Sequence, residues 1–188
     1  MSENFVGKTS VSVAVLALIA FPAMAQTLAP PPLIPYGLPI STESAKNVAA
    51  AAVAEADKNG LNDAIAIVDT GGSLVYFEKM QDTQTGSVDL AIEKARTAAL
   101  FRRPSKVFQD AVAAGGEGLR LLRLTGAIPI EGGVPIIGVD GKLIGAIGVS
   151  GGTGAQDSQV AAAGAQTGGL RSASADKYCP ASPRAQNR

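Results

Sequence analysis

The stretch from Ala127 to Gly152 constrains the fold most, because three short apolar runs there are separated by two turns. The runs are Ala127–Ile130, Val134–Val139 and Lys142–Ser150, and Val, Ile, Ala and Gly dominate them. Asp140-Gly141 lies between two of the runs and predicts a hairpin with a type I′ turn, whose two central residues both need positive φ. Because the runs are apolar on both faces, we predict three antiparallel strands at the centre of one sheet, with other elements packed on each side.

The rest of the chain predicts one more hairpin and four helices around these strands. Residues 64–70 and 73–80 form the hairpin through Gly71-Gly72, and Asp69 is expected to cap the amides of its turn. Residues 114–126 are rich in glycine and are predicted to be a loop. Helices are predicted at residues 40–59, 88–101 and 105–113 and from the segment 151–154 to Gln166, with Ser41, Ser87 and Ser105 as N-caps of the first three. This order predicts an α/β fold, an α-β-α sandwich built on one five-stranded antiparallel sheet.

Four segments follow from the composition along the chain. Residues 1–25 have the features of a secretory signal peptide, with an apolar run, Val11–Phe21, that is too short to span a bilayer and the small residues of Ala23-Met24-Ala25 before the cleavage point. Residues 26–39 are a proline-rich linker, residues 40–170 form the domain, and residues 171–188 are a polar tail. We therefore expect a periplasmic or secreted protein without stable membrane insertion.

The composition removes several function classes. With 16 basic and 16 acidic side chains and 4% aromatic residues, the chain lacks the excess of positive charge and the aromatic side chains typical of nucleic-acid binding. Because His is absent, imidazole metal ligands and Ser-His-Asp or Cys-His hydrolase sites are excluded. The one cysteine, Cys179, allows no intrachain disulfide. The segment 151–154 lacks the lysine and spacing of a phosphate-binding loop, so we expect a glycine-rich exit from a strand.

Four motifs together resemble the haem-binding, or haem-degrading-domain, family typified by GlcG and HbpS. They are IAIVDTGGSLVYFEKMQD, GSVDLAIEKARTAALFRRPS, IPIEGGVPI and DGKLIGAIGVSGGTGAQD, and the resemblance runs from about Leu38 to Gln166. It implies a profilin-like α-β-α sandwich and a homo-oligomer, a dimer or an octamer. Close-packing alanine-rich helices and sheet edges that need covering also favour a homo-oligomer.

The resemblance also implies where a cofactor such as haem would bind. The cofactor-binding residues that it implies are Tyr76, Met80, Asp82, Arg96, Thr97, Phe101, Arg103, Gly132 and Gly133. Without histidine, Met80 is the expected ligand of haem iron and Tyr76 the next donor. The guanidinium groups of Arg96, Arg102 and Arg103 match the propionates of haem.

The sequence is compatible with three functions. The first is a periplasmic or secreted, oligomeric protein that binds haem or another small molecule. The alternative is a cofactor-independent enzyme for a small carboxylic acid or carbonyl compound, with Lys94, Arg103 and Glu131 as catalytic candidates. The plain alternative for the helix residues is that Lys94 and Arg96 are solvated, with Glu93 pairing with Arg96. The third function is a structural accessory to an electron-transfer dehydrogenase.

Overall fold

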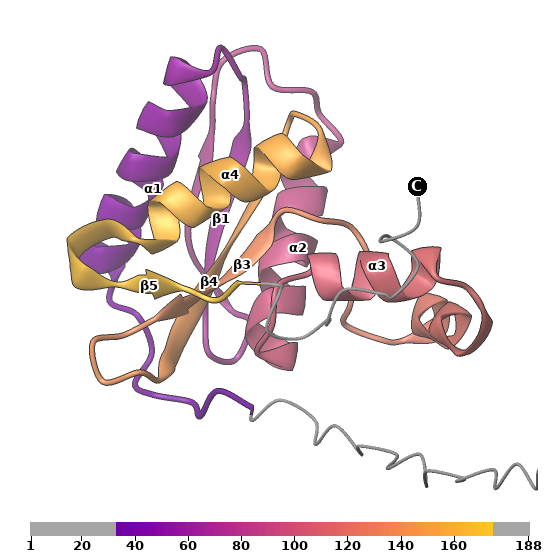
Figure 1. Cartoon of the computed structure of the whole chain (residues 1–188). Coiled ribbons are helices and arrows are strands. Elements are labelled where there is room, and N and C mark those ends of the chain that lie inside the picture. Colours follow the sequence, from indigo (N-terminus) through magenta and orange to yellow (C-terminus); the bar gives the residue numbers. More distant parts are fainter. Residues whose placement is uncertain (1–32, 175–188) are drawn as a thin grey trace, which may run out of the picture.

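The computed structural model describes residues 33–174, which form a three-layer sandwich of helices and one sheet (Figure 1). The predicted signal peptide, most of the linker and the tail with Cys179 lie outside the described residues. The sheet has five antiparallel strands in the order β2-β1-β4-β3-β5. The predicted fold class is therefore confirmed.

The elements have the following bounds. The helices are α1 (Thr42–Lys58), α2 (Ser87–Phe101), α3 (Lys106–Ala113) and α4 (Gly154–Ala165), with the 3₁₀ helices η1 (Gly116–Arg123) and η2 (Thr167–Gly169). The strands are β1 (Ala64–Asp69), β2 (Leu74–Lys79), β3 (Gly133–Ile137), β4 (Leu143–Ser150) and β5 (Arg171–Ser172).

Two apolar cores hold the layers together. On one face of the sheet, α1 and α4 pack over Ile65, Ile67 and Ile147. On the other face, the alanine stripe of α2 packs over Ala64, Ala66 and Ala146. Small residues allow this close approach, since a Cβ on Gly148 of β4 would lie 2.5 Å from a backbone nitrogen of α2.

One predicted strand is wrong, and its place in the sheet is taken by another segment. Residues 127–130 are not a strand, and the amide of Ile128 donates instead to the hydroxyl of Thr97, at 2.8 Å. The free edge of β3 pairs with β5, whose residues lie in the predicted polar tail. The count of five strands is right, but the fifth strand comes from after α4.

The two hairpin turns differ in detail from the prediction. At the second turn Gly141 has φ +79° while Asp140 is not in the left-handed region, so the turn is not type I′. The amide of Gly138 donates to the carbonyl of Lys142, which fits a longer loop that ends in a left-handed glycine. At the first turn the Asp69 carboxylate accepts the amides of Gly71 (2.8 Å) and Ser73 (2.9 Å), as predicted.

The N-cap predictions hold for one helix. Ser41 accepts the amide of Ser44 and caps α1. Ser87 is instead the first residue of α2, is fully buried, and its hydroxyl accepts from that of Ser150. Ser105 occupies the cap position of α3 without capping it, because its hydroxyl accepts the amide of Gly133.

The predicted loop 114–126 contains η1, and the end of the linker is attached to the sheet. In η1, Leu119 and Leu122 repeat at the three-residue period of a 3₁₀ helix and are exposed. Gly37 donates to the carbonyl of Leu143 at 2.7 Å, and Leu143 donates to Pro35 at 2.9 Å. The linker thus covers the first residue of β4 where β1 does not reach it.

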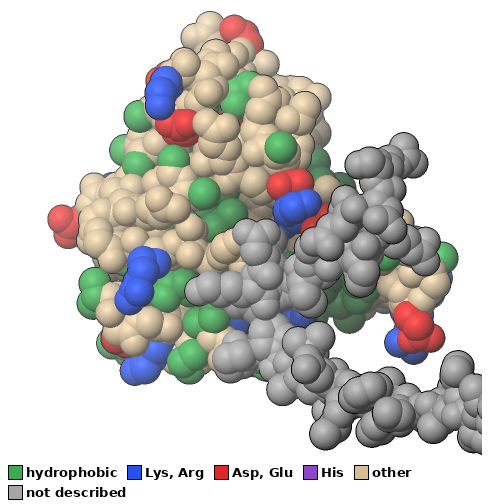
Figure 2. Space-filling view, viewed as in Figure 1, with side chains coloured by type: hydrophobic (Ala, Val, Ile, Leu, Met, Phe, Trp, Pro, Cys, Tyr) green, Lys and Arg blue, Asp and Glu red, His purple; other side chains and the backbone are tan. Residues whose placement is uncertain are grey.

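The surface is mixed in charge. On the face in Figure 2, the described Lys and Arg side chains alternate with Asp and Glu rather than gathering into a patch of one sign. Within residues 33–174, no helix is both long and apolar enough to cross a membrane.

Candidate functional site

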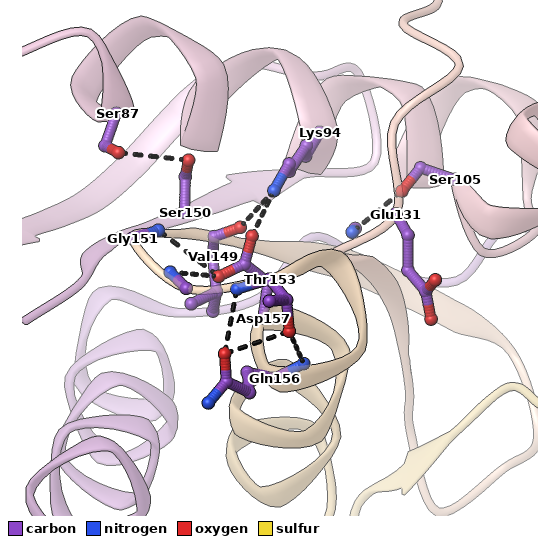
Figure 3. A network of polar contacts seen from close by, with 12 residues as sticks. Ser87, Lys94, Ser105, Glu131, Val149, Ser150, Gly151, Thr153, Gln156 and Asp157 are labelled. Carbon is purple, nitrogen blue, oxygen red and sulfur yellow. Dashed lines mark hydrogen bonds and ion pairs between the residues drawn. The ribbon is translucent and has the colours of Figure 1, made fainter. Parts of the chain in front are cut away.

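A buried ion pair joins the two helical layers through the sheet (Figure 3). The ammonium of Lys94 on α2 lies 2.6 Å from a carboxylate oxygen of Asp157 on α4 and donates to the carbonyl of Val149 at 2.9 Å. The side chains of Lys94 and Asp157 are only 2% and 3% exposed. Lys94 is therefore a buried bridging residue, and the alternative of a solvated lysine is wrong.

The first turn of α4 presents the carboxylate to this lysine. The second oxygen of Asp157 accepts the amides of Gly151 (3.2 Å) and Gly152 (2.9 Å). Thr153 and Gln156 complete a reciprocal capping box at the same helix start. The loop amides are thus bonded to the protein's own carboxylate, as expected of a strand exit and not of a phosphate cradle.

Gly132 and Gly133 let β3 begin against this pair. Gly132 has φ +121°, and a Cβ on it would lie 2.8 Å from the Lys94 nitrogen and 2.9 Å from the Asp157 Cβ. A Cβ on Gly133 would collide with the backbone carbonyl of Lys94. The two glycines therefore serve close packing around the ion pair.

A second carboxylate, that of Asp63, is buried beside the pair. Asp63 precedes β1, is fully buried, and neither of its carboxylate oxygens has a hydrogen-bond partner in the described structure. Burial raises its pKa to about 6; the charge of Asp157 acts in the same direction and that of Lys94 opposes it.

An open groove of about 350 Å³ lies next to the buried cluster, between α3, α4, β3 and the chain after β5. Its apolar wall includes Val134 and Ala162, and its charged groups are Lys106 and Glu131. Lys106 donates to Asp110 at 2.8 Å and lies 3.8 Å from Glu131. The hydrogen bond to Asp110 raises the pKa of Lys106, to which Glu131 adds, so the groove keeps a cation at neutral pH. The full lining is Pro104, Lys106, Glu131, Val134, Ser158, Ala162, Ser172, Ala173 and Ser174.

The catalytic candidates Lys94, Arg103 and Glu131 do not converge on one open pocket. Lys94 points into the interior, while the carboxylate of Glu131 points away from the Lys94–Asp157 pair (Figure 3) and lines the groove. The guanidinium of Arg103 lies over the ring of Phe108, 6.0 Å from its centroid. The geometry therefore leaves only Glu131 of the three facing an open site.

The cofactor-binding candidates on α2 fall into three places. Thr97 is fully buried, and its hydroxyl donates to the carbonyl of Glu93 and accepts from the amide of Ile128. Arg96 lies elsewhere, bonded to the carbonyl of Gly72 and paired with Glu93 as anticipated. Phe101, near the end of α2, packs edge-to-face on Phe108 with ring centroids 5.2 Å apart.

Met80, Tyr76 and Asp82 do not line the groove, and of the three only Met80 bonds to a residue of the buried cluster, Asp63. Met80 is packed against the α1–α4 core, and its sulfur accepts the amide of Asp63 at 3.5 Å. The hydroxyl of Tyr76 donates to Glu78 at 3.2 Å, and the charge of Glu78 raises the pKa of this phenol. Asp82 is exposed, with φ +63°.

Sequence reasoning missed Asp63, Asp157 and Lys106 as parts of the site. For Asp157 a signal existed, since an acidic residue in the first turn of a helix just after Gly151-Gly152 can bond to their amides. For Asp63 the only signal was a charge directly before the buried strand β1. Lys106 has no local signal, because α3 and β3 meet only in the folded chain.

The chain is similar to several known proteins. GlcG of Escherichia coli K12 is 44% identical over 111 residues, which are 59% of this chain and 81% of GlcG. The crystal structure of Klebsiella pneumoniae ORFY is 30% identical, with a TM-score of 0.63, over 69% of this chain and 90% of ORFY. A crystal structure described as a complex of PduOC with haem is 27% identical, with a TM-score of 0.65, over 73% of this chain and all of PduOC.

The family match covers the sandwich from α1 to α4 and stops before β5. The family described as "Haem degrading protein HbpS-like" matches residues 40–166, from the residue before the α1 cap to the end of α4. The match takes in the Lys94–Asp157 pair, Asp63 and the Glu131 side of the groove. The chain belongs to the HbpS-like family, as its four motifs predict.

Proposed function

We propose that this protein is an exported, oligomeric member of the HbpS-like family that binds haem or a closely related tetrapyrrole. The observation that carries the proposal is the likeness to PduOC, which was solved as a haem complex and is covered over its full length. The export is inferred from the signal-like residues 1–25, and the oligomer from the alanine-rich helices and the sheet edges.

The described residues do not fit a haem that is held through its iron. Haem iron is bound in proteins by His, Cys, Met or Tyr. The chain has no His, and within residues 33–174 the remaining donors are Met80, Tyr76 and Tyr36. Met80 is half-buried and its sulfur accepts the amide of Asp63, while Tyr76 bonds to Glu78 and has a raised pKa. The hydroxyl of Tyr36 donates to the carbonyl of Leu100 at 2.9 Å, and an iron ligand would have to give up that bond.

The groove fits the other parts of such a ligand. Val134 and Ala162 offer an apolar wall to a ring edge, and Lys106 is a cation that can pair with a propionate carboxylate. Its volume, about 350 Å³, is at the low end of the range for ligand pockets, about 300–1,000 Å³. We therefore place the ring edge and one propionate in the groove.

The test is native mass spectrometry of the protein purified from its own host, followed by titration of the purified protein with haem. We expect a haem mass on an oligomer, and a Soret change that saturates. Ala162→Phe, which fills the groove, should abolish the change, while Ala50→Phe on the exposed side of α1 should leave it intact. Titration without any Soret change would refute haem binding, and equal binding by both variants would refute the groove as its place.

A further inference from the structure

The carboxylate of Asp63 is the least satisfied group of the described interior. Both of its oxygens are buried without a hydrogen-bond partner, and its backbone is fully engaged. Its amide donates to Met80 and its carbonyl accepts the hydroxyl of Thr83 at 3.1 Å. Buried carboxylates are nearly always paired or hydrogen-bonded, because an isolated buried charge is costly. Because the Asp63 carboxyl is buried and unpaired, we expect its function to depend on whether it is protonated.

Two charged groups face Asp63, one from each helical layer. They are Asp157 on α4 and Lys94 on α2, which already bond to each other. The contacts from the chain between β2 and α2, Met80 and Thr83, are neutral. With Asp63 protonated the buried cluster is electrically neutral, and with Asp63 ionised two carboxylates share one ammonium.

Gly151 connects the two carboxylates mechanically. Its amide donates to Asp157, and a Cβ on it would collide with a carboxylate oxygen of Asp63 and the carbonyl of Asn62. The backbone of Gly151 therefore lies against Asp63 on one side and bonds to Asp157 on the other. Gly151 and Gly152 are exposed, so water can reach the cluster if this loop moves.

We propose that Asp63 is a proton-operated switch that sets how tightly the loop Gly151–Gly152 and the start of α4 are held. When Asp63 is protonated, the Lys94 ammonium pairs with Asp157 alone, and Asp157 accepts both loop amides. When it is ionised, the excess negative charge is relieved by opening the loop to water. The same opening reaches the groove, since Gly154 at the start of α4 packs against the side chain of Glu131.

The switch operates in mildly acidic solution. The pKa of Asp63 is raised to about 6 by burial first and by Asp157 second. The loop should therefore be closed at pH 5 and more open at pH 7.5. This switch would act whether or not the protein binds a tetrapyrrole.

The experiment is amide hydrogen exchange by NMR between pH 5 and pH 7.5, with rates corrected for the intrinsic effect of pH. We expect the protection of the Gly151 and Gly152 amides to fall about tenfold or more as Asp63 ionises, which is the effect of one pKa unit. In Asp63→Asn the protection should not change with pH. The matched control is the amide of Gly71, which also donates to a carboxylate, that of Asp69, but has no second buried carboxylate beside it.

Two outcomes would overturn the proposal. One is a protection of Gly151 and Gly152 that shows the same pH dependence in wild type and in Asp63→Asn. The other is a midpoint at the ordinary value of 3.8 when the wild-type Asp63 carboxyl is titrated and followed by carbon-13 NMR. This measurement needs no variant, so it also applies if Asp63→Asn does not fold. A midpoint near 6 with a parallel shift of the Gly151 amide would support it.

Discussion

Removing the ammonium of Lys94 should destabilise the fold severely, although no ligand contact is involved. Lys94→Met keeps much of the side-chain volume but leaves the Asp157 carboxylate buried with only the amides of Gly151 and Gly152. The carbonyl of Val149 also loses its donor. A buried carboxylate that has lost its cation keeps the full penalty of desolvation without the attraction that offset it.

The magnitude follows from burial. Breaking a buried pair by removing one partner costs about 3–5 kcal/mol, and both side chains here are 3% exposed or less. Domains of this kind are stable by roughly 5–15 kcal/mol, so the loss is a large fraction of the total. Lys106→Met is the matched control. The ion pair of Lys106 with Asp110 is of similar length, 2.8 Å, but the Lys106 side chain is 38% exposed. An exposed pair contributes about 0.2–1 kcal/mol.

The assay is urea unfolding at pH 7 followed by far-ultraviolet circular dichroism, since the chain has no tryptophan. A double-mutant cycle with Asp157→Asn should show that the second substitution costs far less in Lys94→Met than in wild type, with a coupling of about 1–3 kcal/mol. The reasoning is refuted if Lys94→Met costs no more than Lys106→Met, or if the two substitutions at the buried pair are additive.

Three further substitutions test single residues. Asp63→Asn should stabilise the protein at pH 8 but not at pH 3.5, as measured by urea midpoints. In wild type the folded-state pKa of Asp63, about 6, exceeds its ordinary value of 3.8. The wild-type protein therefore has a stabilisation below pH 3.8 that it loses as the pH rises through 6, and the loss is up to about 3 kcal/mol. Gly133→Ala should destabilise by several kcal/mol in the same assay, because its Cβ meets a backbone carbonyl, whereas Gly86→Ala, with nothing within 4 Å, should not; equal effects would contradict the packing argument. Thr97→Val should cost about 1–3 kcal/mol, since the amide of Ile128 loses its acceptor, and a neutral result in thermal unfolding would contradict that hydrogen bond.

The predicted elements that hold in the structure are those set by neighbours along the chain. The two apolar runs and the glycine turn of residues 64–80 form β1 and β2, and Ser41 caps α1 as expected. The failures are contacts between distant segments. Residues 127–130 look like a strand, but Thr97 takes up the amide that a strand neighbour would have bonded.

The same division applies to the candidate site. The sequence singled out Lys94, Glu131, Gly132 and Gly133, and the structure places all four around the start of β3. It did not reveal that Lys94 is buried, because a lysine on a helix is more often solvated than paired inside. The sequence also did not reveal that Tyr76, in β2, and Met80, just after β2, pack against the α1–α4 core.

The sequence by itself determined the sandwich, the family and the absence of an imidazole, since hydrophobic periodicity, turn residues and composition are properties of the chain. Only the tertiary structure decided which charges meet. Lys94 and Asp157 are 63 residues apart on helices that cover opposite faces of the sheet, and their side chains meet because Gly132 and Gly133 leave room for the contact. Asp63 acquires its raised pKa from the same assembly, since burial and the charge of Asp157 exist for it only once the layers have packed.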